Sequence, residues 1–141
     1  MNKNLKIFAT FLPILVIGIF VAPGRADDEI GPTSVSCWFF RGDRVELKQT
    51  CTYRTLWDQE RAGAVFLRWQ DGVETRISWG YLGDGNRPCE DRKVDNVCGI
   101  GYFRDPTSLK RISQEESQKR GVGRPIVNCI LLPDKSICWL R

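Results

Sequence analysis

The chain has 141 residues, a formal net charge of +4, six cysteines and no histidine. The absence of histidine excludes Ser-His-Asp and Cys-His catalytic centres, H-E-x-x-H zinc sites and a histidine general base. Three of the 21 basic residues lie in residues 1–26, which hold no acid, so the remainder is nearly neutral and does not indicate a nucleic-acid partner.

The N-terminal segment has the pattern of an export signal. Residues 1–6 carry two lysines and no acid, and residues 7–22 form an apolar run. The run is shorter than the roughly 20 residues that a membrane-spanning helix needs, and an uncleaved anchor is the alternative. Gly24 and Ala26 place small residues at the positions that signal peptidase reads. We therefore predict a cleaved signal peptide over residues 1–26.

Residues 27–141 are expected to form a single domain that is secreted or periplasmic, with no stable membrane span after cleavage. All the cysteines lie in this part, and an even number in a small exported domain indicates a disulfide framework. No metal site or cofactor is expected, because the cysteines form no C-x-x-C pair and histidine is absent. The cysteines are Cys37, Cys51, Cys89, Cys98, Cys129 and Cys138.

The first hairpin is predicted from two strand patterns, at residues 35–40 and 45–53, on either side of a Gly-Asp turn. Apolar residues recur at almost every second position, which is the period of a half-buried strand. The register places Cys37 and Cys51 opposite or diagonal to each other on one face, so we pair them. The same face is expected to hold Val35, Phe39, Val45 and Leu47.

The other face of this hairpin yields the candidate binding site. It carries two large aromatic residues, Trp38 and Phe40, among polar neighbours that include Lys48. Such residues either form an exposed patch that anchors a partner or are covered by another strand or by residues 107–120. On the first hypothesis, Trp38, Phe40 and Lys48 form the partner site.

A second hairpin surrounds the sequence Gln70-Asp71-Gly72. A two-residue loop would place apolar residues opposite charged ones, whereas a three-residue loop with Gly72 in the left-handed conformation keeps each face uniform. We therefore predict the longer, bulged turn. It pairs Trp69 with Val73, Leu67 with Thr75 and Val65 with Ile77.

The C-terminal third contains one strand pattern at residues 97–103 and a polar stretch at residues 107–120, expected to be a short helix or a mobile loop. A last hairpin is predicted around Pro133-Asp134, which places Cys129 and Cys138 directly opposite each other. We expect these two to be bridged. By elimination, Cys89 pairs with Cys98.

These elements predict an all-β fold, a small disulfide-stapled barrel or sandwich of about six or seven strands built from hairpins. The stretch Trp69–Ile77, the Cys37/Cys51 hairpin and the closing Ser136–Trp139 resemble small exported bacterial cysteine-containing proteins of uncharacterised function. A looser similarity is to periplasmic lysozyme inhibitors, which are also small disulfide-bearing β-barrels. Neither resemblance implies a catalytic residue.

No enzyme is expected, because no pair of carboxylates is fixed by a motif. A compact stapled β scaffold without catalytic groups suits recognition. The leading hypothesis is a secreted or periplasmic binding module whose partner is an envelope protein or a glycan. The alternatives are a structural component of the envelope and a proteinaceous inhibitor of a cell-wall hydrolase.

Overall fold

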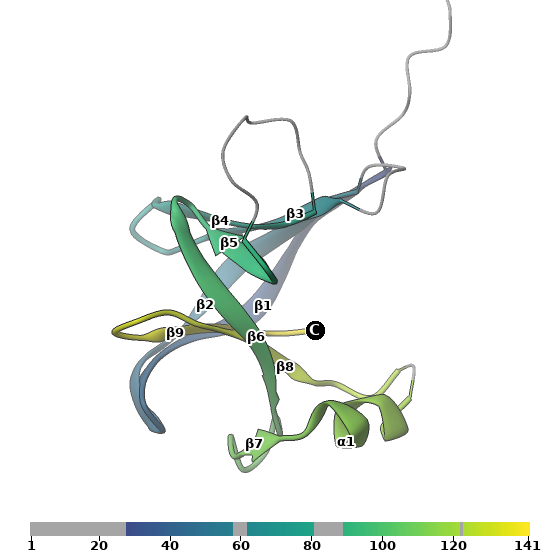
Figure 1. Cartoon of the computed structure of the whole chain (residues 1–141). Coiled ribbons are helices and arrows are strands. Elements are labelled where there is room, and N and C mark those ends of the chain that lie inside the picture. Colours follow the sequence, from purple (N-terminus) through teal and green to yellow (C-terminus); the bar gives the residue numbers. More distant parts are fainter. Residues whose placement is uncertain (1–27, 58–61, 81–88, 122) are drawn as a thin grey trace, which may run out of the picture.

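The computed structural model describes residues 28–57, 62–80, 89–121 and 123–141. The predicted signal peptide lies outside the described residues. Within them the chain forms nine strands and one short helix (Figure 1). The elements are β1 (Asp28–Arg41), β2 (Arg44–Trp57), β3 (Gly63–Arg68), β4 (Glu74–Trp79), β5 (Arg92–Val94), β6 (Val97–Arg104), β7 (Arg111–Ile112), α1 (Gln114–Lys119), β8 (Val127–Leu131) and β9 (Ser136–Leu140).

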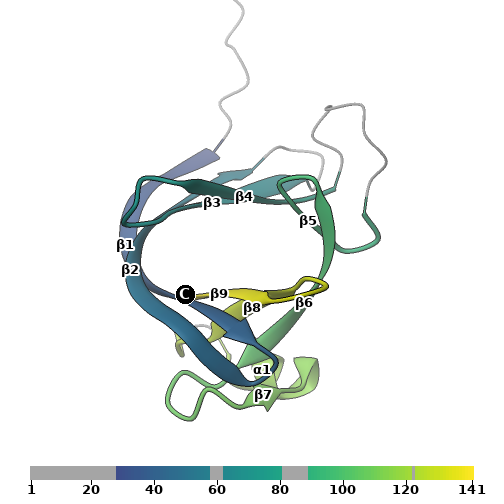
Figure 2. The same ribbon diagram turned by 90° about the vertical axis from the view of Figure 1, so that its left-hand side faces the viewer.

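The strands form one antiparallel sheet in the order β5-β4-β3-β2-β1-β9-β8-β6-β7. β5 also pairs with β6, so the sheet closes into a ring, and β7 lies on the edge of β6 outside it (Figure 2). Closure removes the exposed sheet edges that would otherwise favour aggregation. The all-β prediction is confirmed, and of its two alternatives the structure is the barrel, with more strands than expected.

The predicted turn chemistry sets the register of the second hairpin. The Trp69 backbone N–H donates to the Val73 carbonyl over 2.8 Å, and Gly72 has a φ of 85°, the left-handed region that favours glycine. The bulged three-residue loop is therefore confirmed. Leu67 pairs with Thr75, and Val65 pairs with Ile77, as expected.

All three predicted disulfides are present: Cys37–Cys51, Cys89–Cys98 and Cys129–Cys138. Cys129 and Cys138 are direct cross-strand partners whose Cα atoms lie 4.1 Å apart, as the two-residue turn requires. Cys51 stands opposite Val35, so its bridge to Cys37 is diagonal. Closed loops of this length are worth about 3 kcal/mol each on the chain-entropy model.

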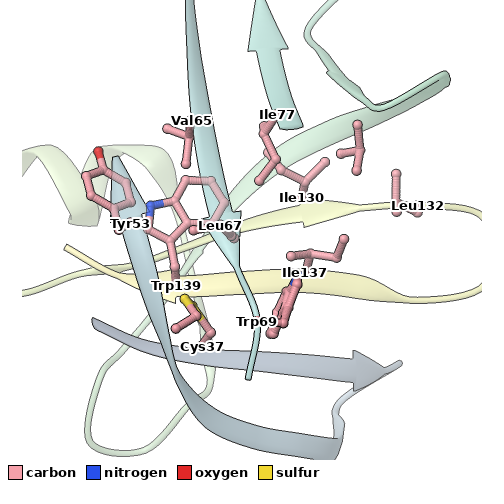
Figure 3. Close-up of a cluster of buried hydrophobic side chains, with 12 residues drawn as sticks. Cys37, Tyr53, Val65, Leu67, Trp69, Ile77, Ile130, Leu132, Ile137 and Trp139 are labelled. Carbon is pink, nitrogen blue, oxygen red and sulfur yellow. A yellow bond between two sulfur atoms is a disulfide. The ribbon is translucent and has the colours of Figure 1, made fainter. Parts of the chain in front are cut away.

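Alternation along the strands directs one set of side chains into the barrel, where they form the main core (Figure 3). Each apolar side chain fully withdrawn from water contributes roughly 1.5–3 kcal/mol. The core therefore supplies much of the driving force for closing the ring. Its buried members are Cys37, Cys51, Tyr53, Val65, Leu67, Trp69, Ile77, Val94, Ile130, Leu132, Ile137 and Trp139.

A second group of buried side chains, the outer cluster, covers the outside of the barrel wall. Trp38 is 4% exposed and Phe40 is 0% exposed, so the hypothesis that they form an exposed binding patch is wrong. They are covered, as the alternative reading of the hairpin expected. The cluster comprises Trp38, Phe40, Val127, Cys129 and Cys138, with Tyr102, Leu109 and Leu140 packed against it.

The expected position of Val45 is also wrong. The register shifts at a bulge between Phe39 and Phe40, so that Val45 pairs with Phe40. Val45 therefore lies on the face of Phe40 and not on the inner face. A bulge places an extra residue on one strand, which strict alternation cannot anticipate. Val45 is exposed as a result.

Arg104 closes the outer cluster. Its side chain is 1% exposed, and its guanidinium carbon lies 4.1 Å from the centroid of the Phe40 ring. The guanidinium donates to the Leu109 carbonyl (2.7 Å), the Gly42 carbonyl (3.1 Å) and the Asp43 carboxylate (2.9 Å). One buried side chain thus connects the turn between β1 and β2 to the loop that follows β6.

Of the two alternatives for residues 107–120, the short helix is confirmed over Gln114–Lys119 as α1, which starts from Ser113. The Ser113 hydroxyl accepts a hydrogen bond from the Glu116 backbone N–H (3.0 Å), a standard N-cap for an otherwise unpaired donor. Arg120, just after the helix, reaches back to the Asp105 carboxylate over 2.7 Å. The helix is therefore held next to the loop that covers the outer cluster.

Candidate functional site: an aromatic cavity at one end of the barrel

One end of the barrel holds a partly open cavity of about 170 Å³, referred to below as the aromatic cavity. Its wall combines aromatic rings, aliphatic side chains and a few polar groups, which is the usual make-up of a small-molecule site. The lining residues are Tyr53, Thr55, Trp57, Val65, Ile77, Trp79, Arg92, Gly101, Tyr102, Phe103, Asn128, Cys129, Ile130, Trp139 and Arg141.

The first wall of the aromatic cavity depends on a glycine. Gly63 on β3 pairs with Trp57 on β2 and with Trp79 on β4, so the three form a row across the sheet. The two indoles meet edge to face with their centroids 5.0 Å apart. A Cβ added to Gly63 would overlap the Trp79 ring. Glycine is therefore what allows this wall to form.

The facing wall is a second row across three strands. Asn128 on β8 pairs with Phe103 on β6 and with Trp139 on β9. Because cross-strand partners point to the same face of a sheet, the two rings flank the Asn128 amide. This wall therefore presents a polar amide between two aromatic surfaces.

Two arginines line the aromatic cavity. Arg92 donates to the Asp91 carboxylate over 2.9 Å, and its guanidinium carbon lies 5.1 Å from the centroid of the Trp79 ring. Asp91 offsets part of the Arg92 charge. Arg141 is held by reciprocal 3.1 Å backbone hydrogen bonds with Ile126. Among the described residues, these two arginines are the charged side chains that line the cavity.

Two buried polar groups belong to the same wall. The Trp139 Nε1 atom is buried and has no hydrogen-bond partner among the described residues, an arrangement that costs roughly 1–3 kcal/mol. Burial raises the pKa of the Tyr53 hydroxyl, and the positive charge of Arg141 opposes part of that rise. In Figure 3 the Trp139 nitrogen lies on the side of the indole that faces Tyr53.

The opposite end of the barrel has a wider groove of about 560 Å³ between three hairpin turns. Phe39 and Trp69 stack at its base with ring centroids 4.3 Å apart. Trp69 Nε1 donates to Thr75 Oγ1 over 2.9 Å, and Asp71 accepts from the Val73 backbone N–H over 3.0 Å. These polar groups are satisfied within the fold, so the groove is the weaker candidate.

None of the three residues proposed from the sequence lines the aromatic cavity. Trp38 and Phe40 belong to the outer cluster, and Lys48 extends over Trp38 with its Nζ atom 5.8 Å from the ring centroid. Sequence reasoning missed Trp57 and Trp79. The register of the second hairpin could have found half of this row, because pairing Val65 with Ile77 also places Gly63 opposite Trp79.

No protein-family model, curated protein or solved structure matches the chain. The two resemblances drawn from the sequence therefore stay predictions. Three disulfides are consistent with an oxidising extracellular or periplasmic location. In the part of the chain that the structure describes, no helix has the length and apolar character needed to span a bilayer.

Proposed function

We propose that this domain is a secreted or periplasmic binding module that holds a small, ring-shaped group in the aromatic cavity. The observation that carries the proposal is the row of Trp57, Gly63 and Trp79, where a glycine leaves room for two indoles that line the cavity. Aromatic side chains of this kind bind flat apolar faces through area burial and stacking.

The size of the aromatic cavity supports a single ring. Its volume is about 170 Å³, and an apolar cavity of about 150 Å³ is known to accept benzene. A larger ligand would have to extend out of the mouth. The natural ligand is therefore either a small molecule or one terminal ring of a larger envelope component.

The groups around the cavity suit binding better than catalysis. Two arginines, one amide and the Trp139 indole supply hydrogen-bond donors, and no aspartate or glutamate side chain among the described residues lines the cavity to act as a base. The Tyr53 hydroxyl stays protonated at neutral pH, because burial raises its pKa. Among the described lining residues there is therefore no general base that could work as a pair with the Tyr53 hydroxyl as general acid.

Ligand-observed NMR with phenol, a neutral single ring, tests this proposal. Phenol should receive saturation from the wild-type protein and lose it with Thr55→Phe, since Thr55 lines the aromatic cavity and the added ring fills it. Val73→Phe makes the same kind of addition at an exposed turn and should leave binding intact.

Overpacking costs roughly 1–3 kcal/mol, so thermal unfolding must first show that Thr55→Phe is folded. If it is not, Val65→Leu makes a smaller addition to the same wall. Phenol binding that persists in a folded, filled variant, or the absence of binding to the wild type, contradicts the proposal.

A further inference from the structure

We infer that the ligand of the aromatic cavity is a six-membered ring that carries a carboxylate. This inference rests on the proposed function and adds the sign of the ligand's charge. It follows from which groups line the cavity, from where the charged ones stand, and from what is already paired with them.

The lining groups favour an anion. In the part of the chain that the structure describes, the charged side chains that line the cavity are Arg92 and Arg141. Asp91 pairs with Arg92 over 2.9 Å, and its Oδ2 atom accepts the backbone N–H of Gly101, a residue of the cavity wall, over 2.6 Å, so its charge offsets that of Arg92. Arg141 supplies the charge that a ligand can neutralise. Its positive charge opposes part of the rise that burial causes in the pKa of the Tyr53 hydroxyl.

The position of the arginines separates the charged end of the ligand from its ring. Arg141 is exposed and Arg92 is half-buried, whereas Val65, Ile77 and Ile130 deeper in the wall are buried. A carboxylate at the mouth therefore keeps part of its hydration and avoids the large penalty of burying an ion. The ring enters the apolar part and contacts the indoles.

The geometry of arginine favours a carboxylate as the anionic group. The planar guanidinium donates in a fork that matches the two oxygens of a carboxylate, and such charge-assisted bonds are about twice as strong as neutral ones. The Asn128 amide stands beside Trp139 in the same wall and can donate to an oxygen substituent of the ring. Aromatic acids and sugar acids share this chemistry.

Two matched pairs of compounds test the inference by titration calorimetry or ligand-observed NMR. Benzoate is compared with benzyl alcohol, and glucuronate with glucose. A ligand of this size is expected to bind with a dissociation constant on the order of 1 mM. The acid of at least one pair should bind about tenfold more tightly than its neutral partner, and the pair that does so distinguishes an aromatic acid from a sugar acid. Benzylamine should bind more weakly than benzyl alcohol.

Arg141→Gln removes one of the two cations of the cavity wall and should weaken binding of the preferred acid about tenfold. It should change the affinity for the neutral partner compound by less than about twofold. Arg141→Lys keeps the positive charge but lacks the paired donors of the guanidinium, so its affinity for the acid should lie between those of the wild type and Arg141→Gln. The matched control is Lys135→Gln, which removes a cation from the groove at the opposite end of the barrel and should change neither affinity.

The outcomes separate the two proposals. If acid and neutral compounds bind equally and Thr55→Phe abolishes both, the cavity is a binding site but the inferred carboxylate is wrong. If the acid binds better and Arg141→Gln has no effect, the charge acts elsewhere and the inference is again wrong. If none of the compounds binds, the proposed function fails and the inference fails with it.

Discussion

The outer cluster and the aromatic cavity adjoin each other at the barrel wall, where they share Tyr102 and Cys129, and both collect aromatic side chains. On β9, Cys138 belongs to the outer cluster while its neighbour Trp139 lines the cavity. Both regions bury an indole nitrogen without a partner among the described residues, at Trp38 and at Trp139. They differ in what covers them.

The outer cluster is sealed by its own chain. Arg104, Leu109 and Tyr102 pack over Trp38 and Phe40, and the hydrogen bonds of Arg104 are all directed to groups of the protein. In the aromatic cavity, glycines at positions 63 and 101 leave room for the Trp79 ring and the Asp91 carboxylate, and a volume of about 170 Å³ stays open between the walls. Both regions are rich in aromatic side chains, and the open volume beside them is what distinguishes the cavity.

The largest expected effect is at Trp38. Trp38→Ala removes a buried indole from the outer cluster and should lower the free energy of unfolding by roughly 3–5 kcal/mol. Affinity of the folded variant for benzoate should stay unchanged. Denaturant unfolding with the disulfides intact measures the loss. Lys48→Ala, which trims only the exposed side chain above the ring, should cost less than about 1 kcal/mol.

Arg104→Met should destabilise by roughly 2–4 kcal/mol, because it keeps the volume but removes charge-assisted hydrogen bonds to two carbonyls and to Asp43. Arg111→Met is the matched control, since Arg111 also pairs with Asp43 (3.3 Å) but is exposed. It should cost less than about 1 kcal/mol. Equal losses for the two variants would show that Arg104 does not seal the cluster.

Trp57 should show the reverse pattern. It is 36% exposed, so Trp57→Ala should lower stability by only about 1 kcal/mol, while binding of a ring compound to the cavity should weaken about tenfold. Trp57→Phe keeps an aromatic surface and should retain most of the affinity. A variant that loses stability but not affinity would contradict the assignment of Trp57 to the cavity wall.

The smallest expected effect is the dependence of stability on pH through Asp105. The Ser108 backbone N–H, followed by the Arg120 guanidinium, holds the pKa of Asp105 well below its usual range. A lowered folded-state pKa stabilises the protein above the unfolded pKa of about 4, and this contribution is lost as the pH falls below that value. The melting temperature of Asp105→Asn should thus lie below that of the wild type at pH 6, and the gap should narrow towards pH 2. A constant gap would contradict this assignment.

Local features of the fold could be predicted from the sequence. Two-residue spacing around Pro133-Asp134 gave the Cys129–Cys138 bridge, and the bulged turn at Gly72 set the register of β3 and β4. Both depend on residues fewer than ten positions apart. In such hairpins the turn residues and the alternation of side chains determine pairing directly.

The candidate site could not be predicted in the same way, because it depends on how the ring closes. Arg92 joins the cavity through the pairing of β5 with β4 and β6, and Trp139 joins it through the pairing of β9 with β1. Short strands such as Arg92–Val94 carry little periodicity. The cover of Trp38 could be predicted only in part: residues 107–120, which include Leu109, were one candidate for it, whereas the role of Arg104, more than sixty positions away in the chain, left no local signal.

The central claim is tested most directly by the indole N–H signals of the five tryptophans, observed in a ¹⁵N-labelled sample during titration with benzoate. Each signal is assigned by one Trp→Phe variant. Trp57, Trp79 and Trp139 line the aromatic cavity, and their signals should shift together with a single dissociation constant. Trp38 in the outer cluster and Trp69 in the opposite groove should not move. Saturable shifts at Trp38 or Trp69 with none at the cavity residues would contradict the claim.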